Sequence, residues 1–219
     1  MYDIININEV SQMNTNVINF YIFTNKLKEK IRTGWIQIGI SSERLESVAE
    51  HIYGCLMLAI AIDSEYQLDI DMFKVLKILS LHELEEIIMK DYTIRDNITR
   101  EEKLKLGKEC VKKVTDGLLK QEEIIELLDE YNLRKTKEAV FCYHIDKIEC
   151  DFQAKIYDLK GDFDLSRALK DIEYYGEEYE WIKDKVACAS DVWIEYDKGL
   201  YKSDKIFENL INDIQKINQ

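Results

Sequence analysis

Apolar residues recur along the chain three and four positions apart, which is the spacing of amphipathic α-helices. Val17, Phe20, Leu27 and Ile31 follow this spacing and predict a first helix over residues 16–31. Residues 32–46 contain two glycines, lack a sustained apolar stripe and predict a loop. Later stripes predict helices over about residues 47–60, 71–89, 99–120, 122–131 and 134–159, with two or three more between 162 and 219.

Two of these predicted helices begin with a capping box, in which a Ser or Thr side chain and a Glu three residues later satisfy free backbone N–H groups. Ser47 and Glu50 form the first, and Thr99 and Glu102 form the second. The helix after Ser47 carries a stripe of Val48, Ile52, Cys55, Leu56, Ala59 and Ile60. The helix over 134–159 carries Phe141, Ile145, Ile148, Phe152 and Ile156.

The pattern predicts an all-α protein. The chain has 219 residues, no proline and eight glycines, so little interrupts the helices. No linker or repeat divides it, and we expect one helical domain over residues 1–219, with a core over about 16–160 and a C-terminal helical extension over about 162–219.

The net charge of the chain limits the classes of partner that it can bind. The chain carries 43 acidic and 30 basic residues, a net charge of −13, which disfavours binding to a nucleic-acid polymer or an anionic membrane. The five cysteines form no CxxC pair and are expected to be reduced core residues. The N-terminal MYDIININEV lacks the basic start and apolar run of a signal peptide, so a cytoplasmic protein is expected.

The candidate site residues are polar side chains that fall on the buried apolar stripes of predicted helices. His51 lies between Val48 and Cys55 on the buried stripe of its helix, and His82 follows Leu79 on that of the next. Buried imidazoles and carboxylates need a partner, and two histidines with two carboxylates from separate helices would satisfy this by holding a divalent cation. Such a cation suggests hydrolysis, because it makes bound water a nucleophile near neutral pH.

Three segments carry a resemblance to a known family. They are Glu46-Ser-Val-Ala-Glu-His51, then Leu81-His-Glu-Leu-Glu-Glu86 followed by Asp91, and His144-Ile-Asp146-Lys-Ile-Glu149. In order, spacing and helical placement they resemble the HD phosphohydrolase superfamily, and more closely its small all-α 5′-deoxynucleotidase-like branch. Arg32-Thr-Gly-Trp35 is similar to the family's substrate loop.

The resemblance implies a role for each residue. His51, His82, Glu83 and Asp146 would hold one divalent metal (Mn, Co, Zn, Fe, Ni or Mg). Glu86, one helical turn after His82, would position or deprotonate the attacking water, and Asp91 would lie near the leaving group or sugar. Arg32 and Trp35 would contact the phosphate and the nucleoside.

Each of these residues also has a structural interpretation. Asp91 is equally a helix-end residue, Arg32 a cap for the first helix, and Trp35 a core residue. His144 lies about 200° around its helix from Asp146 and is expected to be structural. The aromatic residues of the C-terminal region are expected to serve packing or a subunit interface: Tyr174, Tyr175, Tyr179, Trp181 and Trp193.

The chain departs from the family pattern at two positions. Glu83 replaces the aspartate of the family's His-Asp pair, and Lys90 replaces the usual glycine before Asp91. The longer Glu83 side chain leaves open a working site with altered metal preference or a degenerate one.

The resulting hypothesis is a metal-dependent phosphohydrolase that converts deoxynucleoside 5′-monophosphates to nucleoside and phosphate. One alternative is an HD-fold protein that has lost catalysis through Glu83 and binds a nucleotide or a protein. Another is a hydrolase of a different phosphorylated metabolite. The expected partner is a small phosphorylated substrate, and because members of this branch commonly dimerise, a homodimer is expected.

Overall fold

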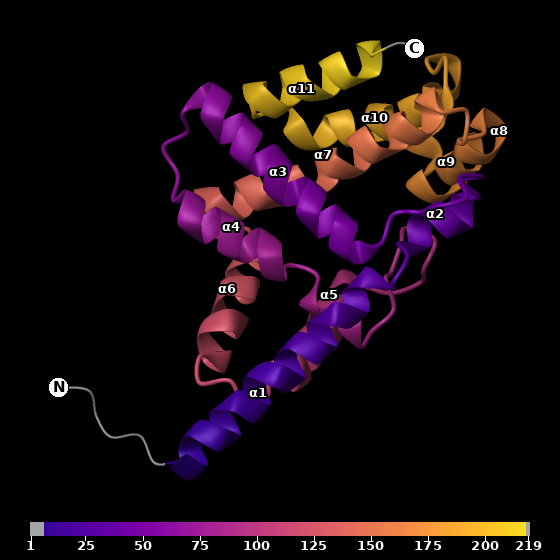
Figure 1. Cartoon of the computed structure of the whole chain (residues 1–219). Helices are drawn as coiled ribbons and strands as arrows, with labels where there is room; N and C mark the ends of the chain where they lie inside the picture. Colours follow the sequence, from indigo (N-terminus) through magenta and orange to yellow (C-terminus); the bar gives the residue numbers. More distant parts are fainter. Residues whose placement is uncertain (1–6, 218–219) are drawn as a thin grey trace.

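The chain folds as a set of packed helices (Figure 1). The computed structural model describes residues 7–217, and this part contains no strand, only one isolated bridge between Ile31 and Ser47. The prediction of an all-α protein is confirmed. Residues 1–6 and 218–219 lie outside the described part, and with them most of the N-terminal segment judged to lack a signal peptide.

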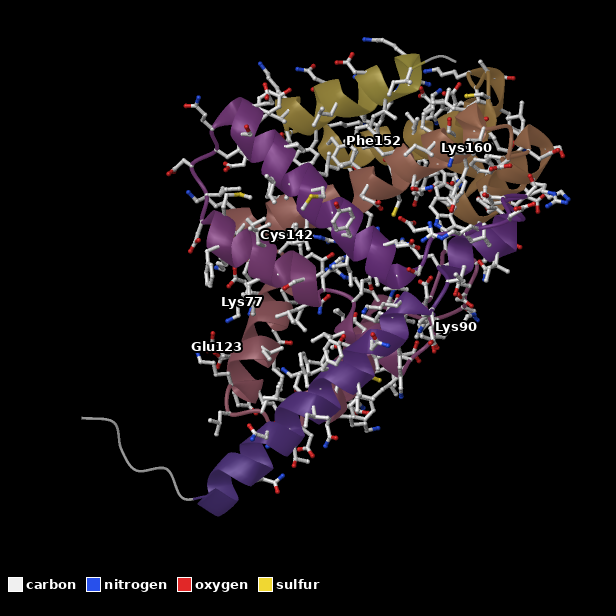
Figure 2. All side chains as sticks on the ribbon, viewed as in Figure 1. Lys77, Lys90, Glu123, Cys142, Phe152 and Lys160 are labelled. Carbon is white, nitrogen blue, oxygen red and sulfur yellow. The ribbon has the colours of Figure 1, made fainter. Side chains whose placement is uncertain are left out.

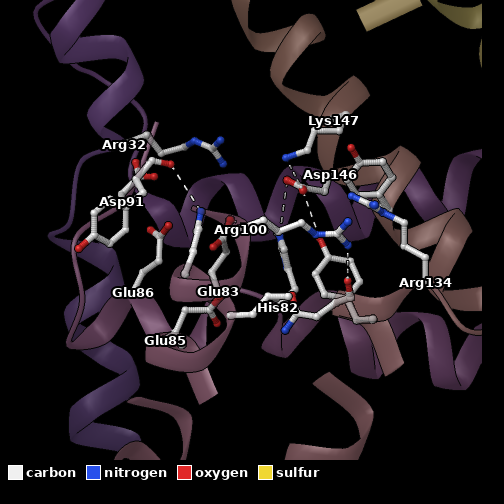
Figure 3. Close-up of a pocket in the computed structure, with 17 residues that line it drawn as sticks. Arg32, His82, Glu83, Glu85, Glu86, Asp91, Arg100, Arg134, Asp146 and Lys147 are labelled. Carbon is white, nitrogen blue, oxygen red and sulfur yellow. Dashed lines mark hydrogen bonds and ion pairs between the residues drawn. The ribbon is translucent and has the colours of Figure 1, made fainter. Parts of the chain in front are cut away.

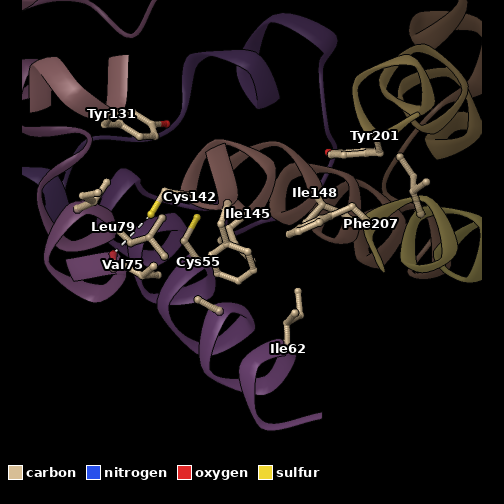
Figure 4. Close-up of a cluster of buried hydrophobic side chains, with 14 of the residues drawn as sticks. Cys55, Ile62, Val75, Leu79, Tyr131, Cys142, Ile145, Ile148, Tyr201 and Phe207 are labelled. Atoms are coloured by element: carbon tan, nitrogen blue, oxygen red, sulfur yellow. Dashed lines mark hydrogen bonds between the residues drawn. The ribbon is translucent and has the colours of Figure 1, made fainter. Parts of the chain in front are cut away.

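A long helix, α7 (Lys137–Leu159), forms the centre of the molecule. Around it pack α3 (Val48–Tyr66), α4 (Met72–Leu81), α6 (Gln121–Leu133), α10 (Ala189–Asp197) and α11 (Lys205–Lys216). Figure 4 shows the apolar cluster between them, where Cys55 and Ile145 lie together and Ile148 meets Phe207. This core fixes the relative positions of α3, α4 and α7.

A second group of elements lies beside α4. It consists of α1 (Ile7–Asn25), η1 (Lys26–Lys28), η2 (Leu84–Ile87) and α5 (Arg100–Val114). Helix α5 packs on η2 and on α6. An ion pair between Lys77 and Glu123, visible in Figure 2, joins α4 to α6 at the surface.

A third group surrounds Trp35, which is buried with Ile172, Ile182 and Val192. It is built from short elements: α2 (Thr33–Ile38), α8 (Leu165–Ala168), η3 (Leu169–Asp171), α9 (Ile172–Tyr175) and η4 (Glu177–Asp184). The short η5 (Lys198–Tyr201) packs instead on α10 and α11. Trp193 of α10 stacks on Trp35 with ring centroids 4.9 Å apart. Of the C-terminal aromatic residues, Tyr175, Tyr179 and Trp193 take part in this packing as predicted, whereas Tyr174 and Trp181 are exposed.

Local sequence signals were accurate at the helix starts. Both capping boxes form, Ser47 with Glu50 and Thr99 with Glu102. The five cysteines are free, and Cys55, Cys110 and Cys142 are buried. No helix in the described residues is long and apolar enough to cross a membrane.

The prediction of one helix over residues 71–89 was wrong. Helix α4 ends at Leu81, and η2 begins at Leu84 after a turn at His82 and Glu83. Nδ1 of the His82 ring is hydrogen-bonded to the carbonyl oxygen of Leu79 at 2.8 Å. This bond satisfies one of the carbonyl groups that have no partner at the helix end. His82 and Glu86 therefore do not lie on one face of a continuous helix.

Other boundaries also differ from those predicted. The first helix ends at Asn25, the one after Thr99 ends at Val114, and the predicted loop over 32–46 contains α2. Gly39 ends α2 with φ +70°, a left-handed conformation that glycine adopts without strain. Ile60 and Ile156, predicted to be buried, are 46% and 42% exposed because their stripes are narrower than the sequence indicated.

Candidate metal centre

Three elements bring the four predicted ligands together. His51 lies on α3, His82 and Glu83 occupy the turn after α4, and Asp146 lies on α7. One ligand atom from each lies within 4.8 Å of all the others. His51 Nε2 is 3.2 Å from Asp146 Oδ1 and 3.4 Å from His82 Nε2. Glu83 Oε1 is 3.6 Å from His82 Nε2 and 3.8 Å from His51 Nε2.

In each of the two imidazole rings, the hydrogen bond made by Nδ1 determines that Nε2 is the nitrogen available to bind a metal. His82 Nδ1 faces the Leu79 carbonyl, and His51 Nδ1 faces Glu149 Oε2 at 2.5 Å. Carbonyl and carboxylate oxygens only accept hydrogen bonds, so both Nδ1 atoms must donate. In the neutral rings, both Nε2 atoms then present lone pairs to each other and to two carboxylates.

Such an arrangement requires a positive charge at its centre. Lone pairs and carboxylates at these separations repel one another unless a proton or a cation lies between them. Two imidazole nitrogens and two carboxylate oxygens are a donor set that divalent metals accept, with second-shell acceptors holding the rings. The residues present therefore fit the metal that the sequence implied.

One side of this cluster opens to a pocket. His82, Glu83 and Asp146 line it, together with Arg32, Glu86 and Asp91 (Figure 3). The buried Cys55 thiol, 3.6 Å from His51 Nε2, is a further neighbour but does not line this pocket. A metal held by the four predicted residues would thus face a space large enough for a ligand.

Comparison with known proteins identifies the family of this chain. A model of the HD domain family matches residues 24–186. This chain belongs to the HD domain family. It is 34% identical over 151 residues to the 5′-deoxynucleotidase HDDC2 of Dictyostelium discoideum, covering 66% of this chain and 78% of the relative. It is also 34% identical over 160 residues to the 5′-deoxynucleotidase hdd1 of Schizosaccharomyces pombe, covering 69% and 78%.

The fold of this HD-domain protein is also found in a solved structure. A protein from Pyrococcus horikoshii superimposes with a TM-score of 0.61 and 24% identity, covering 91% of this chain and 98% of that one. At this identity the likeness supports the fold alone.

Glu86 and Asp91 occupy one side of the pocket, next to Arg32 (Figure 3). Glu86 is buried on η2, and the Lys30 ammonium donates to its backbone carbonyl. Asp91 follows this segment, and its Oδ2 accepts from the Thr33 backbone N–H at 2.6 Å. Glu86 thus reaches the pocket through the turn after α4 and not through the helical spacing from which it was predicted.

Arg32 and Trp35 both line a second pocket, and of the two only Arg32 also lines the metal pocket. The Arg32 guanidinium lies at the boundary between the metal pocket and this second pocket, and donates to Cys150 Sγ at 3.1 Å. Trp35 lines only the second pocket; it is 1% exposed, and its Nε1 donates to Glu46 Oε2 at 2.8 Å. Trp193 lines this pocket too, so its wall is partly aromatic.

Two residues that support the site were not assigned by the sequence. Glu149 holds the His51 ring, and the Tyr131 hydroxyl donates to Asp146 Oδ2 at 3.1 Å. Glu149 lies one helical turn after Asp146, and this spacing is the signal that could have identified it. Tyr131 comes from α6, and nothing local in the sequence indicates its contact. His144 bonds Asp204 at 3.2 Å, consistent with its predicted structural role.

Burial and neighbouring charges raise the pKa values of several side chains at this HD site. Burial raises the pKa of Glu86 to about 10, assisted by the negative charges of Glu83 and Asp91. Burial also raises the pKa of Glu46 to about 7, assisted by Glu149. Burial lowers the pKa of His82, but its contact with Cys55 and the charge of Glu83 raise it overall to about 9.

These shifts predict how the stability of the metal-free protein depends on pH. A carboxyl such as Glu86 with a raised folded-state pKa contributes stability that is lost as pH rises above its unfolded value of 4.5. The stability contributed by His82 is fully present below its unfolded-state pKa of 6.5, and it is lost as pH rises through its folded-state pKa of about 9. Both groups therefore predict a falling melting temperature between about pH 5 and pH 9.

A divalent metal should reverse this trend, because it replaces the protons at the cluster. We expect the rise in melting temperature on adding Mn²⁺ to be at least about 5 °C larger at pH 8.5 than at pH 5.5. Thermal denaturation of chelator-treated and Mn²⁺-loaded protein measures this difference. A metal-induced rise that is equal at both pH values would contradict the assigned charges.

Proposed function

We propose that this protein is a metal-dependent 5′-deoxynucleotidase that hydrolyses deoxynucleoside 5′-monophosphates to deoxynucleoside and inorganic phosphate. The observation that carries the proposal is the pair of Nε2 atoms of His51 and His82, 3.4 Å apart and facing two carboxylates beside an open pocket. The similarity to 5′-deoxynucleotidases supports the choice of substrate.

His51, His82, Glu83 and Asp146 would hold one divalent ion. Such an ion offsets phosphoryl charge and lowers the pKa of bound water. Glutamate and aspartate carboxylates ligate the same metals. The Oε1 of Glu83, 3.6 and 3.8 Å from the two imidazole nitrogens, supports its role as a ligand despite the longer side chain.

The remaining pocket residues would bind and orient the substrate. Arg32, between the two pockets, would contact the phosphate, because a guanidinium matches phosphate oxygens with paired donors. The nucleoside would then extend into the second pocket, beside Trp35 and Trp193. Trp193, half-buried and stacked on the buried Trp35, would offer aromatic surface to a base or sugar.

Proton transfer would involve the two carboxyls on the Arg32 side. Glu86, which is buried and lines the pocket beside Glu83, would accept a proton from the attacking water. Asp91, held by the Thr33 backbone N–H and lining both pockets, would lie beside the 5′-oxygen of a nucleotide that spans them. It would orient or protonate that leaving oxygen.

We extend the proposal to the whole molecule. The chain would be one domain over residues 1–219, because α10 and α11 of the C-terminal region pack on α7, which carries Asp146. Five free cysteines support a reducing, cytoplasmic location. A homodimer would cover the exposed apolar side chains of α1, which include Val17, Ile18, Tyr21 and Ile22.

The experiment is phosphate release from a panel of deoxynucleoside and nucleoside 5′-monophosphates, with Mn²⁺, Co²⁺ or Mg²⁺ added to chelator-treated protein. We expect release from the deoxynucleotides that depends on added metal and stops when the chelator is restored. Absence of release with every metal would overturn the proposed activity. Release from ribonucleotides at equal or higher kcat/KM would overturn the proposed sugar preference.

A further inference from the structure

Three arginines line the metal pocket, and two of them, Arg100 and Arg134, have no part in the proposed function. Arg100 and Arg134 line this pocket, and among the described residues neither forms an ion pair with a carboxylate. By contrast, Arg44 pairs with Glu50, and Arg95 pairs with Asp171. In a chain with 43 acidic and 30 basic residues, two unpaired guanidinium groups in one pocket leave a local positive charge open to a ligand.

Arg134 occupies a backbone position that favours glycine. It ends α6 with φ +51°, in the left-handed region where a side chain is disfavoured. Its guanidinium carbon lies 3.7 Å from the centroid of the Tyr143 ring. Tyr143 also lines the pocket, so this contact holds the arginine at the pocket wall and leaves its edge N–H groups able to donate.

Arg100 is also at a site that helix electrostatics disfavours. It is the first residue of α5, where the helix dipole favours an anion. Its Nη2 donates to the carbonyl oxygen of Asn132 at 3.1 Å, near the end of α6 that carries Arg134. Both arginines are therefore anchored around the C-terminal end of α6, and neither position is explained by helix stability.

The two arginines lie across the pocket from Arg32. In Figure 3, Arg32, Asp91 and Glu86 stand on one side of His82 and Glu83, while Arg134 stands on the other with Asp146. The second pocket is lined by Arg32 and Asp91, and neither Arg100 nor Arg134 lines it. A phosphate at the metal ligands would thus have the proposed nucleoside on one side and these two guanidinium groups on the other.

We propose that Arg100 and Arg134 form a second phosphate subsite, which binds the terminal phosphate of a ligand with two linked phosphates, such as a deoxynucleoside 5′-diphosphate. This assignment rests on the proposed function, since it takes the first phosphate to lie at the metal ligands. Guanidinium groups suit this role because their paired N–H donors match phosphate oxygens. Free inorganic phosphate, a product of the proposed reaction, offers the same chemistry.

The test measures binding, so that it does not depend on turnover. Dissociation constants of matched non-hydrolysable phosphonate analogues of a deoxynucleoside 5′-monophosphate and 5′-diphosphate are measured by calorimetry on metal-loaded protein. The variants are Arg100→Gln, Arg134→Gly and the double variant, with Arg44→Gln as the control for loss of an exposed arginine outside this pocket. Arg134→Gly relieves the left-handed residue and should fold at least as stably as the wild type.

We expect the wild type to bind the diphosphate at least about 10-fold more tightly than the monophosphate, since each charged hydrogen bond adds about this factor. The double variant should lose this preference, with monophosphate binding changed by less than about 3-fold. Arg44→Gln should leave both constants unchanged. Equal losses for both nucleotides, or no loss for either, would overturn the subsite.

A second arm separates the two sources of phosphate. With the monophosphate analogue saturating, inorganic phosphate is titrated into wild type and double variant. Binding that disappears in the double variant assigns the subsite to free phosphate and overturns the assignment to a linked one. If no protein releases phosphate from nucleotides, the proposed activity fails, while the ratio of dissociation constants still decides the role of the arginines.

Discussion

Replacing His82 with alanine is expected to lower kcat/KM for phosphate release by at least about 10³-fold and to reduce metal content to background. His82 Nε2 is one of two imidazole nitrogens in the cluster, and its Nδ1 is committed to the Leu79 carbonyl. Alanine removes the ligand and leaves three donors. A metal supplies several kcal/mol of transition-state charge stabilisation, which corresponds to this loss in rate.

His144→Asn is the matched control, because His144 is buried on α7 but bonds Asp204 away from the ligand cluster. It should retain metal and activity even if its stability falls. Steady-state phosphate release and metal analysis of both variants measure the difference. A His82→Ala protein that keeps its metal and more than about a tenth of wild-type activity would refute the assigned ligand.

Replacing Glu86 with glutamine is expected to lower kcat by about 10² to 10⁴-fold while metal content stays at the wild-type level. Glutamine preserves the shape of this buried side chain but cannot accept a proton. Asp91→Asn should likewise lower kcat without changing the metal content, because Asp91 is proposed to act at the leaving oxygen.

Glu85→Gln serves as the neighbouring control. Glu85 also lines the pocket, but its side chain lies against Gly107 of α5. Its rate should stay within about 3-fold of the wild type. If Glu85→Gln loses more activity than Glu86→Gln, the two glutamates have been assigned in the wrong order.

The sequence contained most of the information needed to assemble the metal ligands. His51 and His82 could be identified because each falls on the buried stripe of an amphipathic segment, and packing such stripes together places their polar members together as well. The start of the helix that carries His51 followed from its capping box, which depends on residues four positions apart or fewer. Short-range patterns of this kind can be interpreted without knowledge of the fold.

What the sequence could not supply depends on contacts between distant segments. The turn at His82 and Glu83 interrupts a region whose apolar spacing fits a continuous helix, and tertiary packing of η2 on α5 overrides that preference. Trp35 was assigned to the nucleoside from a family resemblance, with a core role left open, and its contact with Trp193 could be known only from the fold.

The central claim is that His51, His82, Glu83 and Asp146 together bind one divalent metal ion, and a metal titration of chelator-treated protein tests it most directly. We predict one equivalent of Mn²⁺ or Co²⁺ bound by the wild type, and at least about 10-fold weaker binding by Glu83→Gln, which keeps the side-chain length but loses the charge. Absence of stoichiometric binding by the wild type, or equal affinity in the two proteins, would contradict the site as described.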